Sequence, residues 1–113
     1  MTRREGLSAT HNNFGGMLYD AAADAARFAP NKDEAPSLYE ITGIVDRLGA
    51  GDAFTAGLLF ALTTPELSEQ QITVSFATAA GCLAHAIEGD FNYSTRAEVE
   101  ALMSGDASGR VKR

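Results

Sequence analysis

The first half of the chain has short apolar runs separated by polar and turn-forming residues, a pattern typical of strands. Residues 1–15 are polar and rich in turn formers, and Met17–Tyr19 follows them as a short predicted strand. Residues 31–36 form a charged, proline-bounded loop, and Leu38–Val45 is predicted as a further strand. Between the two strands, Ala21–Ala29 has helical propensity, but its position also suits a hairpin connection. Both interpretations stay open from the sequence.

The second half begins with the period of a buried helix. Ala53–Thr63 is predicted as this helix, which Pro65 ends. Its large apolar residues recur at four-residue intervals, at Phe54, Leu58 and Leu62. Small residues on the same segment predict a close approach to a sheet, namely Ala53, Ala56 and Gly57.

Two capping boxes predict two more helices. The box Ser68-Glu69-Gln70-Gln71 begins a helix that Gly89 stops. Its predicted apolar face consists of Ile72, Phe76, Ala80, Leu83 and Ile87. The box Thr95-Arg96-Ala97-Glu98 begins a last short helix, with Val99, Leu102 and Met103 facing inward and a frayed tail from Ser104. A run of small residues in the middle helix suits either an adenine slot or helix packing: Ala77, Ala79, Ala80 and Gly81.

Composition limits the function classes. A chain of 113 residues can form one small domain with a modest core. Its formal net charge of −6 argues against a sequence-independent binder of nucleic acid, and no run is long enough to cross a bilayer, so we expect neither partner. The single cysteine, Cys82, has no disulfide partner, which favours a cytoplasmic setting. His11 and His85 lack metal-ligand spacing, and we assign no metal-ligating residue.

The junction between the last predicted strand and the first predicted helix carries the candidate chemistry. The strand stops at Asp46, a turn containing Gly49 and Gly51 follows, and Asp52 comes directly before the helix. Such a junction gathers unpaired N–H groups and the positive end of a helix dipole, which suits an anionic oxygen or phosphate. A carboxylate beside phosphate is unfavourable unless it takes a proton from a hydroxyl that attacks the phosphate.

The segment Asp46-Arg47-Leu48-Gly49-Ala50-Gly51-Asp52-Ala53-Phe54 resembles the signature of the ribokinase-type (PfkB) carbohydrate kinases, Asp-x-x-Gly-Ala-Gly-Asp-x-Phe. The resemblance continues into Ala56-Gly57-Leu58-Leu59, and Arg47 together with Gly89-Asp90-Phe91 is most similar to the 2-dehydro-3-deoxygluconate (KDG) kinase branch. It covers most of this chain but only the last third of such an enzyme. No Gly-Lys-Ser/Thr follows the turn, so this is not a P-loop.

The resemblance implies a role for each residue of the turn. Gly49, Ala50 and Gly51 would form an anion hole for the transferred phosphoryl group, and Asp52 would be the catalytic base that contacts the sugar hydroxyl. A lone Gly-x-Gly-Asp would also suit a tight turn with an acidic helix cap. The preceding Asp46 and the following Ala-Phe-x-Ala-Gly favour the kinase interpretation.

Three further residues have two interpretations each. Asp46 is either a strand-end cap or the family's acid near the metal and phosphate. Arg47, where the wider family has threonine, would brace a phosphate or an acidic sugar, or pair with Asp46. Asp90 either follows a helix C-cap at Gly89 or reaches the sugar hydroxyls, as the resemblance implies.

The resemblance therefore implies an α/β fold, the C-terminal part of a three-layer α/β/α sandwich, with a few strands followed by three helices across residues 1–113. The N-terminal sugar-binding part and the lid would be absent. The implied activity is ATP-dependent phosphorylation of a sugar or sugar acid at a primary hydroxyl, with KDG as the expected substrate, Mg²⁺ as cofactor and a monovalent cation as an optional one. Alternatives are a ribokinase or fructokinase, or a non-catalytic fragment that binds nucleotide weakly. A missing N-terminal half or a second copy of the chain would be its protein partner.

Overall fold

The computed structural model describes residues 1–6, 11–32, 35–36, 38–42, 49–85 and 95–105. Strands come first: β1 (Thr2–Gly6), β2 (His11–Asp20), β3 (Ala25–Ala29), β4 (Asn31–Lys32), β5 (Ala35–Pro36) and β6 (Tyr39–Thr42). Three α-helices and one 3₁₀ turn follow: α1 (Ala50–Leu62), η1 (Pro65–Leu67), α2 (Gln70–Ala84) and α3 (Arg96–Gly105). The predicted order, strands and then three helices, is confirmed.

The long strand β2 organises a 4-stranded antiparallel sheet. One edge of β2 pairs with β1, with Arg3 opposite Gly15. The other edge pairs with β3 through Gly16–Asp20 and with β6 through His11–Phe14. Residues 21–24 form the turn between β2 and β3, so the hairpin interpretation of Ala21–Ala29 is correct and the helical one is wrong.

More strands form than were predicted, and the first predicted strand is longer than expected. The run at Met17–Tyr19 is part of a strand of 10 residues, and polar residues 2–6 form β1. The predicted loop at residues 31–36 contains the short β4–β5 pair. The last strand covers Tyr39–Thr42, and the remainder of the predicted Leu38–Val45 strand lies outside the described residues.

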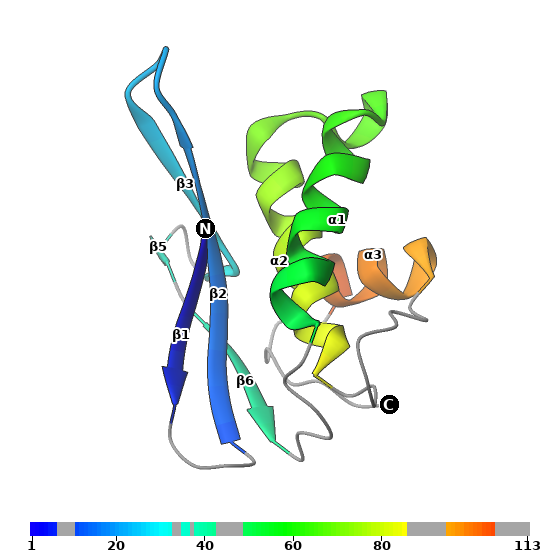
Figure 1. Cartoon of the computed structure of the whole chain (residues 1–113). Helices are drawn as coiled ribbons and strands as arrows, with labels where there is room; N and C mark the ends of the chain where they lie inside the picture. Colours follow the sequence, from blue (N-terminus) through cyan, green and yellow to red (C-terminus); the bar gives the residue numbers. More distant parts are fainter. Residues whose placement is uncertain (7–10, 33–34, 37, 43–48, 86–94, 106–113) are drawn as a thin grey trace.

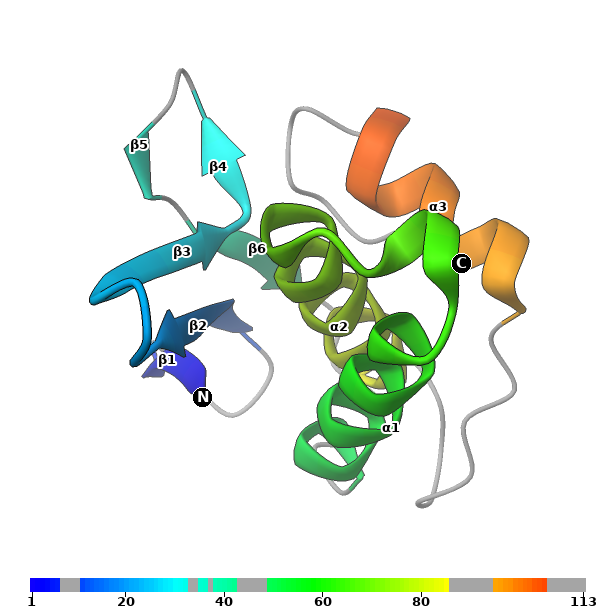
Figure 2. The ribbon, with the colours of Figure 1, turned by 90° about the horizontal axis from the view of Figure 1, so that it is seen from above.

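The helices cover one face of the sheet (Figure 1). α2 lies between the sheet, α1 and α3, as the view from above shows (Figure 2). Nearly all of α2 is buried from Thr73 to Ala84, so it is a central helix without a polar face. The hydroxyls of Thr73 and Thr78 are satisfied by the carbonyl oxygens of Leu67 and Val74, at 2.7 Å each.

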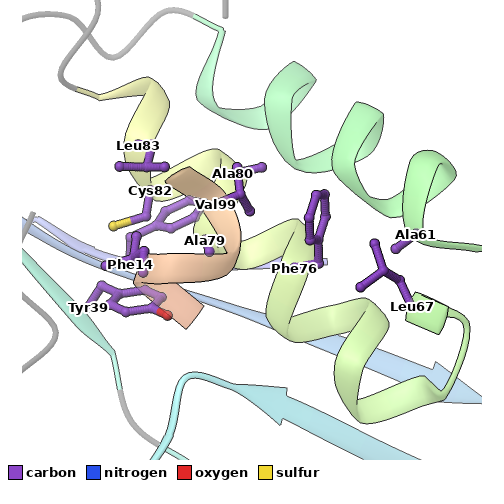
Figure 3. Close-up of a cluster of buried hydrophobic side chains, with 11 residues drawn as sticks. Phe14, Tyr39, Ala61, Leu67, Phe76, Ala79, Ala80, Cys82, Leu83 and Val99 are labelled. Atoms are coloured by element: carbon purple, nitrogen blue, oxygen red, sulfur yellow. The ribbon is translucent and has the colours of Figure 1, made fainter. Parts of the chain in front are cut away.

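The core lies where β2, β6, α2 and α3 meet (Figure 3). Phe14 of β2 and Tyr39 of β6 pack there against the helices. The predicted inward residues of α3 are confirmed, because Val99 and Leu102 are buried and Met103 packs against this core. His85 is also fully buried: its Nδ1 is 2.9 Å from the carbonyl oxygen of Gly81, and its ring contacts Phe14 edge-on.

The face that α1 buries differs from the predicted one. Its buried residues are mostly small, namely Ala50, Ala53, Phe54, Gly57 and Ala61. Leu62 is 49% exposed, and Leu58 is only half-buried. The close approach predicted toward a sheet is made toward α2, since a Cβ on Gly57 would lie 3.0 Å from the Ala80 Cβ. The small residues of α2 thus serve helix packing, which is one of the two interpretations from the sequence; the other was an adenine slot.

The helix caps agree with the sequence at α3 and differ at α2. Thr95 and Glu98 exchange the two hydrogen bonds of a capping box, Glu98 N–H to Thr95 Oγ1 at 3.1 Å and Thr95 N–H to Glu98 Oε1 at 3.2 Å. At α2 the cap is Glu69, whose carboxylate accepts from the N–H groups of Gln71 and Ile72. The capping box predicted at Ser68 is therefore wrong: the N-cap lies one residue later, its N3 residue Ile72 cannot return a side-chain bond, and the Ser68 hydroxyl donates to the carbonyl oxygen of Pro65.

Two glycines at the centre of β2 provide a stability test. A Cβ on Gly16 would lie 2.3 Å from the Thr78 Oγ1 and 2.7 Å from the Phe54 ring, inside the packed core. A Cβ on Gly15 would lie 2.7 Å from the ends of the Arg3 and Leu38 side chains, which can move, and 3.0 Å from the backbone oxygen of Ala29. We expect Gly16→Ala to lower the free energy of unfolding by about 1–3 kcal/mol through overpacking, and Gly15→Ala to lower it less. Urea unfolding followed by circular dichroism measures both, and equal effects would contradict this packing.

Candidate active site

The predicted glycine turn forms the first turn of α1. Gly49 is the N-cap and has left-handed backbone angles, φ 85° and ψ −7°, which a residue with a Cβ adopts only at a cost. The first intrahelical bond runs from the Ala53 N–H to the Gly49 carbonyl oxygen, at 2.7 Å. The helix therefore begins at Ala50 and not at Ala53 as predicted, because the left-handed glycine lets the chain enter the helix directly from the turn.

This start leaves backbone donors without helical acceptors. The N–H groups of Ala50, Gly51 and Asp52 precede the first i→i−4 bond, and the N-cap residue Gly49 makes no side-chain hydrogen bond to them. The aligned peptide dipoles place about half a positive charge at this end of the helix. Donors and dipole together make the start of α1 suitable for an anion.

Gly51 keeps the approach to these donors open. It is exposed, and a Cβ placed on it would meet nothing within 4 Å among the described residues. Ala50, by contrast, is 1% exposed, and its carbonyl oxygen would lie 3.1 Å from a Cβ on Gly81 of α2. The turn is thus fixed to the core on one side by Ala50 and open on the other side at Gly51.

Asp52 stands in the first turn of α1 and is exposed. It belongs to the face of α1 opposite the buried residues Ala53, Phe54 and Gly57. The structure therefore brings together the four sequence-predicted residues Gly49, Ala50, Gly51 and Asp52 at one helix end, with the carboxylate directed away from α2.

The other predicted site residues are not tested. Asp46 and Arg47 lie outside the described residues, as does Asp90. Within the described ranges, no group of three or more histidine, cysteine, aspartate or glutamate side chains is arranged to hold a metal ion. No helix of the described part is long and apolar enough to cross a membrane.

Solved structures resemble this fold closely. The 2-dehydro-3-deoxygluconokinase of Thermotoga maritima matches 92% of this chain at 38% identity, with a TM-score of 0.76. A PfkB family carbohydrate kinase of Listeria grayi matches 91% at 32% identity and a TM-score of 0.78. A candidate 2-keto-3-deoxygluconate kinase of Enterococcus faecalis matches 92% at 29% identity and a TM-score of 0.70. No protein-family model and no curated protein sequence matches the chain.

The fold and the glycine turn together resemble one portion of the ribokinase-type (PfkB) carbohydrate kinases. The chain corresponds to one part of the PfkB kinases, as its sequence resemblance predicted, and the solved structures that match it include KDG kinases. It spans only 28% of the Thermotoga maritima chain and 29% of the Listeria grayi chain.

The two glycines of the turn differ in what a side chain would do to stability. We expect Gly49→Ala to lower the free energy of unfolding by about 1–2 kcal/mol, because its backbone is left-handed. Gly51→Ala should leave stability unchanged or raise it slightly, since the residue is helical and faces open space. Urea midpoints of the two variants test this, and a destabilised Gly51→Ala variant would show that the turn is closed on that side.

Proposed function

We propose that this segment supplies the phosphoryl-transfer centre of an ATP-dependent kinase acting on a primary hydroxyl of a sugar or sugar acid. The observation that carries the proposal is the juxtaposition of uncapped N–H groups at Ala50 and Gly51 with the exposed carboxylate of Asp52. The first suits the charge of a transferred phosphoryl group, and the second suits removal of a proton from the attacking hydroxyl.

In the proposed reaction Asp52 accepts the proton of the sugar hydroxyl while the hydroxyl oxygen forms a bond to the γ-phosphorus of ATP. The bond from that phosphorus to the bridging oxygen breaks, and ADP leaves with the electron pair. The free amides of the glycine turn, at Ala50 and Gly51, stabilise the charge on the transferred oxygens. Mg²⁺ would neutralise charge on the ATP phosphates, but the described residues contain no metal cluster, so its ligands would come from ATP and from other residues.

KDG is the proposed substrate. The 38% identity to the Thermotoga maritima 2-dehydro-3-deoxygluconokinase supports it, as does the likeness to the Enterococcus faecalis protein. Arg47 would brace the acidic group or a phosphate and Asp90 would bind sugar hydroxyls, while Asp46 would lie near the phosphates and a monovalent cation. A ribokinase or fructokinase is the alternative within this class.

A second candidate function concerns the chain by itself: it would be a non-catalytic fragment of a kinase. The small share of the kinase chains that it spans favours this reading. Phosphoryl transfer depends on a held substrate, and a base without one contributes little rate. We therefore assign the activity to a complete kinase that contains this segment.

Exchange of the proposed base tests the mechanism. In a chimera in which this chain replaces the matching segment of the Thermotoga maritima enzyme, we expect Asp52→Asn to lower kcat by about 10²–10⁴-fold. ATP binding should change by no more than a few-fold, because the amides remain. Asp24→Asn is the matched control: Asp24 is an exposed aspartate in the β2–β3 turn with a positive φ that asparagine tolerates. A turnover of Asp52→Asn within tenfold of the parent would contradict the general-base role.

Comparison of the isolated chain with the chimera tests the second candidate and the substrate. We expect no sugar kinase activity from the 113-residue chain alone. The chimera should phosphorylate KDG in preference to ribose or fructose, measured by coupled ADP release. Robust activity of the isolated chain would overturn the fragment interpretation, and a preference for ribose would overturn the assignment of KDG.

A further inference from the structure

The last turn of α2 lies directly against the first turn of α1. Ala84 packs with Ala50 and Ala53 in one buried cluster. Three residues earlier there is no room for a side chain, since a Cβ on Gly81 would lie 3.1 Å from the Ala50 carbonyl oxygen and 2.9 Å from the Phe14 ring. The C-terminal end of α2 therefore supports the glycine turn on its buried side.

The contact at Gly81 fixes a peptide group that has two roles. The Ala50 carbonyl and the Gly51 N–H belong to the same planar peptide group and point in opposite directions. The carbonyl oxygen is the part that meets Gly81, and the N–H is one of the donors that precede the first helical bond of α1. Whatever sets the position of Gly81 therefore also sets where this N–H lies.

His85 completes the turn of α2 to which Gly81 belongs. The helix ends at Ala84, so the carbonyl oxygens of its last turn have no helical donors. The His85 N–H bonds to the Cys82 oxygen at 3.2 Å, and the Gly81 oxygen, which is the usual α-helical acceptor, contacts the imidazole Nδ1 at 2.9 Å instead. A carbonyl oxygen can only accept, so Nδ1 carries the proton and donates it to this bond.

The imidazole of His85 is enclosed by the core. Its residue is fully buried, and its ring contacts Phe14 edge-on, with 5.0 Å between the ring centroids. A polar ring is costly to bury unless it is hydrogen-bonded, so the bond to the Gly81 oxygen is what makes a histidine acceptable here. An apolar residue of similar size would fill the space but would leave that oxygen without this donor.

We propose that His85 is a positioning residue for phosphoryl transfer. Its Nδ1–H holds the Gly81 carbonyl, Gly81 holds the peptide group between Ala50 and Gly51, and that group presents its N–H to the transferred phosphoryl group. The last of these steps rests on the proposed function, whereas the first two rest on contacts in the structure. His85 acts through the turn and takes no part in the proton transfer.

Kinetics of the chimera with the Thermotoga maritima enzyme test the donor. His85→Leu keeps an apolar group of similar size without the Nδ1–H, whereas His85→Asn keeps an N–H donor at the Nδ1 position. We expect His85→Leu to lower kcat by about ten- to a hundredfold, with the KM values for ATP and sugar within a few-fold, because the N–H stabilises charge that develops in the transition state. His85→Asn should restore kcat to within a few-fold of the parent.

Hydrogen exchange in the same chimera, measured by NMR, gives a readout that needs no activity. The Ala53 N–H closes the first turn of α1, at 2.7 Å from the Gly49 oxygen. The Thr73 N–H closes the first turn of α2 in the same way, at 2.8 Å from the Glu69 oxygen. His85→Leu should speed exchange at Ala53 by about tenfold or more relative to Thr73, and His85→Asn should not.

Leu67→Ala is the matched control at the other end of α2. Leu67 is 4% exposed and lies at the end of α2 opposite Leu83 (Figure 3). Its truncation should speed exchange at Thr73 more than at Ala53 and leave kcat within a few-fold. A general loss of stability therefore cannot imitate the effect expected for His85→Leu.

The protonation of the imidazole can be measured without any variant. Long-range proton–nitrogen correlations, assigned through the backbone resonances of the same residue, should show that Nδ1 of His85 carries a proton. A neutral ring protonated only at Nε2 would overturn the proposal, because Nδ1 would then have no proton to donate to the Gly81 oxygen.

The other outcomes also decide. An unchanged kcat in His85→Leu would overturn the positioning role, and an equal loss in His85→Leu and His85→Asn would overturn the role of the donor. Equal acceleration of exchange at Ala53 and Thr73 would reduce His85 to general support of the fold and overturn the proposal. The proposed function fails separately: a chimera that phosphorylates no sugar, or whose activity survives Asp52→Asn, would reject the chemistry, while hydrogen exchange and the tautomer still decide whether His85 holds the turn.

Discussion

The burial of α2 on all sides is the constraint on which the rest of this structure depends. A helix without a polar face must be covered by the sheet, α1 and α3, and its small residues let these elements come close. Gly57 brings α1 against Ala77 and Ala80, while Phe14 and Ala50 pack at Gly81. The position of the glycine turn, and with it of Asp52, is therefore set by core packing as well as by the turn itself.

Local signals in the sequence predicted the elements that depend on local chemistry. The box at Thr95 and Glu98 is such a case, because both of its hydrogen bonds lie within one turn. β1 was missed, since residues 2–6 are polar and become a strand only through pairing with β2. The hydrophobic periodicity predicted that Leu62 is buried, but in the described fold its side chain is half exposed. Periodicity does not show which elements pack against each face of a helix.

The candidate site was predictable for the same reason. Glycine spacing and a following acid are local features, and Gly49, Ala50, Gly51 and Asp52 do meet at the start of one helix. The start of α1 at Ala50 was not predictable. Glycine adopts several backbone conformations, and the sequence does not indicate that Gly49 takes the left-handed one. The exposure of Leu59 was not predictable either, since it depends on which face of α1 packs against α2. The roles of Asp46, Arg47 and Asp90 remain predictions.

The complete burial of Cys82 gives the molecule an internal chemical reporter. The thiol is the only one in the chain and lies in the core beside Phe14, Tyr39 and Leu83 (Figure 3). A reagent can reach it only when α2 separates from the sheet or α3, so the rate of thiol modification measures how often the core opens. Because α2 supports α1 through Gly57, that single rate also reports how firmly the glycine turn is held in place.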